Sequence, residues 1–250
     1  MSAGKADTGE IFAKGATGMI GEDGRMFLDA CKTYGVHSDF IRITDGPSGH
    51  TVIQIDRNAQ NSILLFGGAN RKLTREFIDE VLSHFNREDI LLLQNEVNLL
   101  PYIVDKAYEK GMQIALNPSP FNENLNEVDL SKISIFLLNE VEGFQITGQQ
   151  DSDAILAALR ARFPQARIML TLGADGSVYA DSTQVHHQPI FPVQAVDTTA
   201  AGDTFTGYFV AGLAEGRSME ERMERAARAS SIAVGRMGAA DSIPLAEELA

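Results

Sequence analysis

Two patterns of apolar and polar residues alternate along the chain, one typical of helices and one typical of strands. Apolar positions at helical spacing, each run bounded by a capping residue or a glycine, predict helices over 25–34, 75–84, 99–110, 140–146, 152–163, 204–214 and 219–234. Short apolar runs between turn residues predict strands over 40–43, 50–56, 62–66, 90–94, 113–116, 135–138, 168–172, 177–180 and 185–187. Strands that alternate with helices indicate an α/β fold with a mostly parallel sheet and helices on both faces.

The same pattern predicts where elements begin and how the chain divides. Thr74 and Asn98 precede two of the helices and are expected to cap them, and strands 177–180 and 185–187 are expected to pair as a hairpin. Residues 1–18 show neither pattern, so we expect a poorly structured N-terminus followed by one domain over 19–250. Sites in such sheets lie beyond the carboxyl ends of the strands.

Composition narrows the choice of partners. The chain has 250 residues, a net charge of −13 and a single cysteine, Cys31. This length suits one sizeable core, and the negative charge argues against nucleic acid and anionic membranes as partners. Nucleotide binding stays open, because a helix terminus and Mg²⁺ can dominate the local field. With no signal-peptide pattern and no apolar run long enough for a bilayer, we expect a cytoplasmic protein.

One stretch carries the chemistry, AVDTTAAGDTFTGYFVAGL over residues 195–213. An Asp, Thr and Gly-rich turn leads into an apolar helix, whose first N–H groups and dipole favour an anion. Ala200, Ala201 and Gly202 are small enough for a phosphate to approach the backbone. Asp203 beside such an anion is a candidate general base. The alternative is that Asp197 or Asp203 only caps the helix.

The nine residues DTTAAGDTF, 197–205, resemble the second signature of the ribokinase-like (phosphofructokinase-B type) sugar kinases. The resemblance extends from about Gly18 to the C-terminus. It implies a three-layer α/β/α fold and ATP-dependent transfer of the γ-phosphoryl group to a primary hydroxyl of a pentose such as ribose. In that scheme Asp203 deprotonates the sugar, and the N–H groups of Ala201, Gly202 and Asp203 stabilise the transferring group.

The resemblance also assigns roles to polar residues at two strand ends. Glu96 follows the strand 90–94, where the family has a sugar-contacting Glu, although it could be a solvated loop acid. Asn139 and Glu142 follow the strand 135–138 and fit an N-x-x-E element linked to Mg²⁺ and phosphate placement. Asn139 could instead simply cap the following helix.

Two further segments resemble binding loops of the family. Thr171, Gly173 and Gly176 lie in TLGADG, which resembles a nucleotide-binding loop and could also be an ordinary hairpin turn. The segment AVGRMGAADS, 233–242, resembles the one that completes a potassium site, with a plain glycine-rich helix end as the alternative. The carried-over K⁺ ligands are Asp197, Thr199, Ala233, Arg236, Gly238 and Ser242.

The resemblance breaks at the start of the chain. The family's first strand and lid strands find no counterpart there, so we expect a reduced lid around residues 40–66. This motivates a second hypothesis, a truncated or degenerate relative that binds nucleotide and phosphorylates nothing. An unrelated α/β binding module is a third. The sequence does not name the sugar, and a homodimer is possible.

Overall fold

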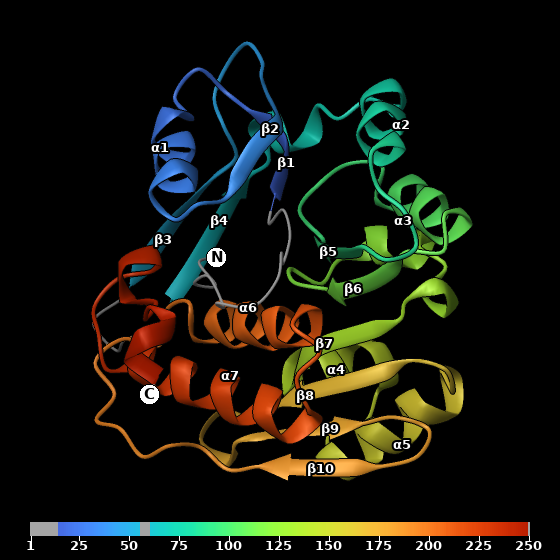
Figure 1. Ribbon diagram of the computed structural model, residues 1–250, viewed down its shortest axis with the longest axis vertical. Helices are drawn as coiled ribbons and strands as arrows, with labels where there is room; N and C mark the ends of the chain where they lie inside the picture. Colours follow the sequence, from blue (N-terminus) through green and yellow to red (C-terminus); the bar gives the residue numbers. More distant parts are fainter. Residues whose placement is uncertain (1–14, 56–60, 250) are drawn as a thin grey trace.

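A six-stranded sheet forms the centre of the computed structural model, which describes residues 15–55 and 61–249 (Figure 1). Its strand order is β10-β9-β8-β7-β6-β5, in which β5 to β8 are parallel and β9 and β10 antiparallel. The strands are β5 (Ile90–Gln94), β6 (Gln113–Asn117), β7 (Ile135–Asn139), β8 (Arg167–Thr171), β9 (Ser177–Ala180) and β10 (Val185–Gln188). The predicted mostly parallel sheet and its terminal hairpin are both confirmed.

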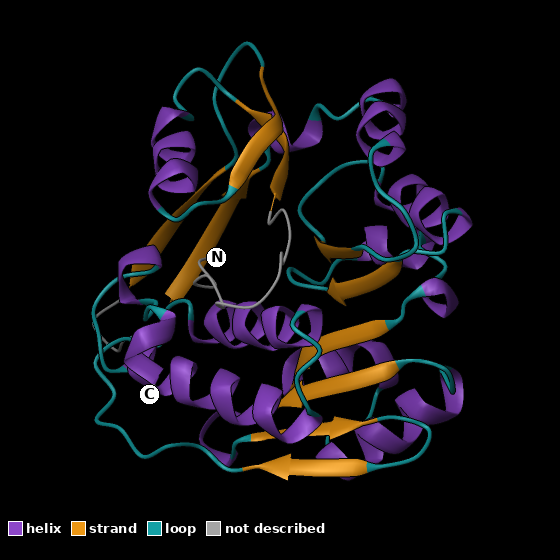
Figure 2. Cartoon of the chain, viewed as in Figure 1, coloured by secondary structure: helices purple, strands orange, loops and turns teal. Residues whose placement is uncertain are grey.

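Helices cover both faces of this sheet, as predicted (Figure 2). One face packs against α2 (Arg75–Ser83), α3 (Leu100–Glu109), α4 (Glu140–Thr147) and α5 (Ser152–Arg162), and the other against α6 (Ala201–Ala214) and α7 (Met219–Val234). In β7, Phe136 and Leu138 enter the first core, while Ile135 and Leu137 enter the second. This period of two is why a buried parallel strand is apolar at nearly every position.

The first part of the described chain forms two smaller sheets. Strands β1 (Gly15–Ile20) and β2 (His37–Ile43) are parallel and are joined through α1 (Arg25–Thr33), and β3 (His50–Ile55) and β4 (Asn61–Phe66) form an antiparallel hairpin. The expectation that residues 1–18 lack structure is wrong for Gly15 to Gly18, which belong to β1. Their glycines and alanine are poor strand formers, so it is the pairing with β2 that makes them a strand. Residues 1–14 lie outside the described part.

A short 3₁₀ helix, η1 (Gly68–Arg71), joins the small parallel sheet to the large one. The N–H of Ala69 donates to the Pro47 carbonyl at 3.1 Å, in the turn after β2. On the other side, Arg71 Nη1 donates to the carbonyl of Val97, just after β5, at 3.1 Å. The turn after β2 and the loop after β5 are therefore held together, although within the described residues β1 forms strand pairing with β2 alone.

The predicted helix boundaries agree with the structure to within one residue except at the start of α6, and one of the two predicted caps is wrong. Thr74 caps α2 by accepting from the N–H of Phe77 at 3.2 Å, as predicted. Asn98 does not cap α3: Leu99, with φ of 58°, is the N-cap, and the Asn98 side chain instead bonds both the N–H and the carbonyl of Leu73. Asn98 therefore forms its hydrogen bonds with the distant Leu73 backbone and not with the N-terminus of α3, which its position in the sequence had suggested. Helix α6 also begins earlier than predicted, at Ala201.

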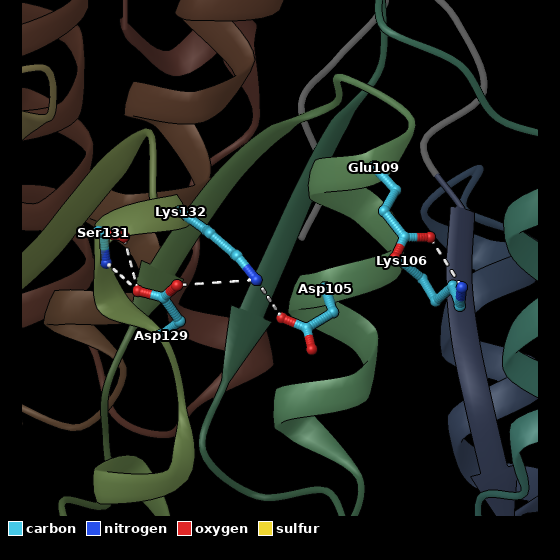
Figure 3. Close-up of polar contacts among 6 residues, drawn as sticks. All are labelled: Asp105, Lys106, Glu109, Asp129, Ser131 and Lys132. Carbon is cyan, nitrogen blue, oxygen red and sulfur yellow. Dashed lines mark hydrogen bonds and ion pairs between the residues drawn. The ribbon is translucent and has the colours of Figure 1, made fainter.

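Charged side chains tie α3 to the segment between β6 and β7 (Figure 3). Lys132, in the 3₁₀ helix η3 (Leu130–Lys132), lies 2.7 Å from Asp105 and 3.7 Å from Asp129. The hydrogen bond to Asp105 raises the pKa of Lys132 above its ordinary value. Lys106 pairs separately with Glu109 along the helix at 2.7 Å.

In the described ranges, none of the helices combines the length and apolar character needed to cross a membrane.

Candidate functional site

The N-terminus of α6 presents backbone donors that have no acceptor in the described part of the chain. Ala200, the N-cap, has φ of 61° and no side chain caps the helix, so neither Asp197 nor Asp203 plays the capping role considered above. The N–H of Ala201 donates to the Thr198 carbonyl at 3.3 Å, and the first N–H bonded back from inside the helix is that of Thr204, at 2.8 Å. Among the described residues no acceptor faces the N–H groups of Gly202 and Asp203. This is the arrangement that favours an anion.

Asp203 lies in the first turn of α6 and its side chain is exposed. Its Oδ1 accepts a hydrogen bond from Nε2 of Gln94, the last residue of β5, at 3.4 Å. Apart from its own helix and chain neighbours, no described atom lies within 4 Å of the position where a side chain on Gly202 would project. Within the described ranges, an exposed carboxylate therefore adjoins open space at Gly202 and two backbone N–H groups that have no protein acceptor.

The end of β5 and the loop after it bring one predicted residue and two that were not predicted to this edge. Glu96 is exposed, two residues beyond Gln94. Asn95 between them is fully buried, and its Nδ2 donates to the Pro120 carbonyl at 2.8 Å while its N–H donates to the Ser119 carbonyl at 3.0 Å. Sequence reasoning singled out only Glu96. The signal for the other two was the run of polar residues directly after an apolar strand.

Asn139 and Glu142 form a reciprocal capping box at the start of α4. The Asn139 side chain accepts from the N–H of Glu142, and the Glu142 carboxylate accepts from the N–H of Asn139, both at 2.9 Å. Asn139 is exposed and Glu142 is 6% exposed. Burial raises the pKa of Glu142, opposed by hydrogen bonds from Asn139 and Ser119.

This geometry bears on the Mg²⁺ prediction. Mg²⁺ keeps several waters and takes few protein oxygens, so the exposed Asn139 side chain suits such a role, directly or through water, with its oxygen shared with the N–H of Glu142. The buried Glu142 suits the role of holding Asn139 in place. Within the described ranges no three His, Cys, Asp or Glu side chains cluster as a metal site would require. The capping alternative is therefore present in the structure, and the Mg²⁺ role stays a prediction.

The TLGADG segment connects β8 to β9 as a hairpin turn. Thr171 pairs in register with Asn139 of β7, so these two strand ends lie side by side. Gly173 has φ of 54° and nothing within 4 Å of an added Cβ, whereas Gly176 has φ of 94° and a Cβ would meet the Gln188 carbonyl oxygen at 2.2 Å. The hairpin requires Gly176, while Gly173 leaves backbone exposed that a nucleotide could approach.

The predicted potassium ligands come from two segments that the structure brings together. The Asp197 carboxylate accepts from the N–H groups of Thr199 at 2.9 Å and Gly238 at 3.1 Å. Hydrogen bonds from Thr199 and Gly238 hold the pKa of Asp197 below its usual range.

The oxygens around Asp197 already have protein partners. The Ala233 carbonyl accepts from the N–H of Arg236, whose guanidinium pairs with Glu248, and the buried Ser242 hydroxyl donates to the Ala239 carbonyl. Carboxylate, carbonyl and hydroxyl oxygens suit a hard cation, but a cation would share each of these with an existing donor or acceptor. The K⁺ site therefore stays a prediction.

Comparison with known proteins places the chain among carbohydrate kinases. A family model described as "pfkB family carbohydrate kinase" matches residues 11–246. The ribokinase of Haemophilus influenzae is 33% identical over 238 residues, covering 92% of this chain and 78% of the relative. The ribokinase of Arabidopsis thaliana is 34% identical, covering 91% of this chain and 64% of the relative. A bifunctional ribokinase/ribose-5-phosphate isomerase A from Fructilactobacillus sanfranciscensis is 34% identical, and this chain spans 44% of its length.

Solved structures agree with this placement. The structure of Arabidopsis thaliana ribokinase complexed with ribose and ATP superimposes with a TM-score of 0.80 at 30% identity, covering 94% of this chain and 80% of that one. The ribokinase of Cryptococcus neoformans var. grubii in complex with ADP gives a TM-score of 0.81 at 30% identity, covering 94% and 81%. With the ribokinase-like α/β fold and the family signature at α6, the chain belongs to the pfkB family of carbohydrate kinases.

Proposed function

We propose that this chain is an ATP-dependent sugar kinase that transfers the γ-phosphoryl group of ATP to a primary hydroxyl of a pentose such as ribose. The observation that carries the proposal is the N-terminus of α6, where N–H groups with no acceptor among the described residues adjoin the exposed Asp203. The relatives named ribokinase support the sugar class, and the Arabidopsis structure holds ribose and ATP.

The chemistry follows from the charges that develop during phosphoryl transfer. Asp203 accepts the proton of the attacking hydroxyl, which strengthens the nucleophile. The N–H groups of Gly202 and Asp203, with that of Ala201 in part, stabilise negative charge on the transferring group. In this class of reaction positioning and electrostatic stabilisation supply most of the rate.

Neighbouring strand ends supply the binding groups. The exposed carboxylate of Glu96 accepts hydrogen bonds from sugar hydroxyls, and the TLGADG turn with Asn139 takes the nucleotide. A bound Mg²⁺ would neutralise phosphate charge, and in this proposal Asn139 would hold it, directly or through water. A monovalent cation near Asp197 would order the turn that precedes α6.

Replacing the proposed base tests the function. Asp203→Asn should lower turnover by about 10²-fold or more, because a general base typically contributes that much. The fold should be unaffected, since the side chain is exposed. Asp153→Asn is the matched control, an exposed acid in the first turn of α5. A coupled ADP-release assay over a sugar panel, with and without K⁺, measures both. Normal turnover in Asp203→Asn would remove Asp203 as the base.

A second candidate function is nucleotide binding without sugar phosphorylation. The observation that favours it is the division of the sheet, because β1 and β2 pair with each other and with no strand of the large sheet in the described ranges. A sugar pocket formed between the β1–β2 sheet and the large sheet would then lack the strand pairing that joins its two sides. Calorimetry with ATP and with ribose separates the two functions. Heat of ATP binding without any ribose binding or ADP release supports the second, and coupled binding with ADP release supports the first.

A further inference from the structure

A contact between distant parts of the chain extends the proposed function. Gln94 and Asp203 are separated by 109 positions in the sequence, yet Gln94 Nε2 lies 3.4 Å from Asp203 Oδ1. This is the one hydrogen bond that the structure shows to the Asp203 carboxylate from any residue it describes. The contact joins the carboxyl end of β5 to the first turn of α6.

The backbone beside Gln94 is held from two directions. Gln94 pairs in register with Asn117 of β6, so strand pairing fixes the position of its backbone along the sheet. The next residue, Asn95, is fully buried and bonded to the Ser119 and Pro120 carbonyls at 3.0 and 2.8 Å. The backbone at Gln94 is therefore fixed by hydrogen bonds on both sides, and its side chain alone reaches α6.

We propose that Gln94 is a positioning residue for Asp203. This inference rests on the proposed function, because the orientation of the carboxylate matters only if Asp203 accepts the sugar proton. A primary amide donates to one carboxylate oxygen and does not take up the proton itself. Gln94 holds Oδ1, and no described residue hydrogen-bonds Oδ2, which is the oxygen that would face the incoming hydroxyl. A group held in its reactive orientation needs no reorganisation at the moment of transfer.

Removing the amide should slow the chemical step and leave binding alone. Gln94→Ala is expected to lower kcat by about 3- to 10-fold, the range that one net hydrogen bond allows. KM values for ATP and sugar should stay within about twofold, since an interaction used only in the transition state lowers kcat and kcat/KM together. The thermal midpoint should equal that of the parent, because the side chain is exposed. Gln150→Ala, an exposed glutamine in the loop between α4 and α5, is the control.

A double-mutant cycle decides whether Gln94 acts through Asp203. In an Asp203→Asn background, Gln94→Ala should cause less than about a twofold further loss, because residues that act as a unit are not additive. An equal fold loss in both backgrounds, a lowered thermal midpoint, or parent-like kcat in Gln94→Ala would each overturn the inference. A fully active Asp203→Asn would overturn the proposed function instead. The two failures are therefore distinguishable.

Discussion

Gly202 shows how much one residue decides at the N-terminus of α6. It is a glycine in a helix, where glycine is normally less favourable than alanine by roughly 0.5–1 kcal/mol. Apart from its own helix and chain neighbours, no atom of the described residues lies within 4 Å of an added Cβ, so packing against this part of the chain does not require glycine there. Gly176 is different, because there the Gln188 carbonyl oxygen excludes a Cβ. Gly176 therefore serves the hairpin, and we assign Gly202 to the space that the phosphoryl group enters.

The first prediction separates stability from activity at this residue. Gly202→Ala should retain the parent's free energy of unfolding, or raise it by up to about 1 kcal/mol, because alanine favours the helix. Turnover should nevertheless fall, since the methyl group occupies the proposed phosphoryl space. Urea denaturation and the ADP-release assay measure the two effects. Unchanged kcat would place the transferring group elsewhere, and Gly176→Ala should show the opposite result, a loss of stability.

At the level of elements, one carboxylate accepts several hydrogen bonds in the turn of the β9–β10 hairpin. Asp181 accepts hydrogen bonds from the Tyr179 hydroxyl at 2.8 Å and from the N–H groups of Thr183 and Gln184 at 2.7 and 3.0 Å. Burial acts to raise the pKa of Asp181, but the hydrogen bonds outweigh it and hold the pKa well below its usual range. Burial, together with Asp181, raises the pKa of Tyr179.

The second prediction follows from the sign of this shift. A carboxyl group with a lowered folded pKa stabilises the fold above its unfolded pKa of about 3.9, and the stabilisation is lost as the pH falls below that value. Asp181→Asn should lower the free energy of unfolding by about 1–2 kcal/mol at pH 7, and the difference should shrink towards pH 3. Urea titrations across this range measure it. A difference independent of pH would contradict the charge argument, and Ser182→Ala, exposed in the same turn, is the control.

At the scale of the whole molecule, the large sheet is packed on both faces while the first part of the chain is lightly attached. Strands β7 and β8 have neighbours on both sides and lie between two cores. The hairpin β3–β4 pairs only with itself in the described ranges, and Leu64, Leu65 and Phe66 on it are exposed. A homodimer through these strands stays a prediction.

The third prediction concerns local stability across these parts. Backbone amides in β7 and β8 should exchange hydrogen at least about 10²-fold more slowly than those in β3 and β4, because core strands open only with much of the fold. Hydrogen–deuterium exchange resolved by peptide measures this directly. Equal protection in both regions would show that the hairpin has a partner, such as a second copy of the chain. Repeating the measurement at several protein concentrations would then identify self-association.

Local signals were sufficient for much of the fold and for the centre of the site. Thr74 capped its helix as expected, and the apolar runs became buried parallel strands, because these features depend on residues a few positions apart. Local signals failed at Asn98, whose side chain bonds Leu73 across 25 positions, and at β1, which has weak strand residues and depends on β2. Both failures occurred where a distant partner outweighed local preference.

The family, the α/β architecture and the small-residue turn that opens α6 can each be inferred without a structure, because each is encoded in a contiguous motif or a short periodic pattern. Three features emerge only from the folded arrangement: which N–H groups of α6 lack an acceptor among the described residues, the exposure of Asp203, and its contact with Gln94. These contacts depend on how β5 and α6, far apart along the chain, come together at one edge of the sheet. No local preference contains that information.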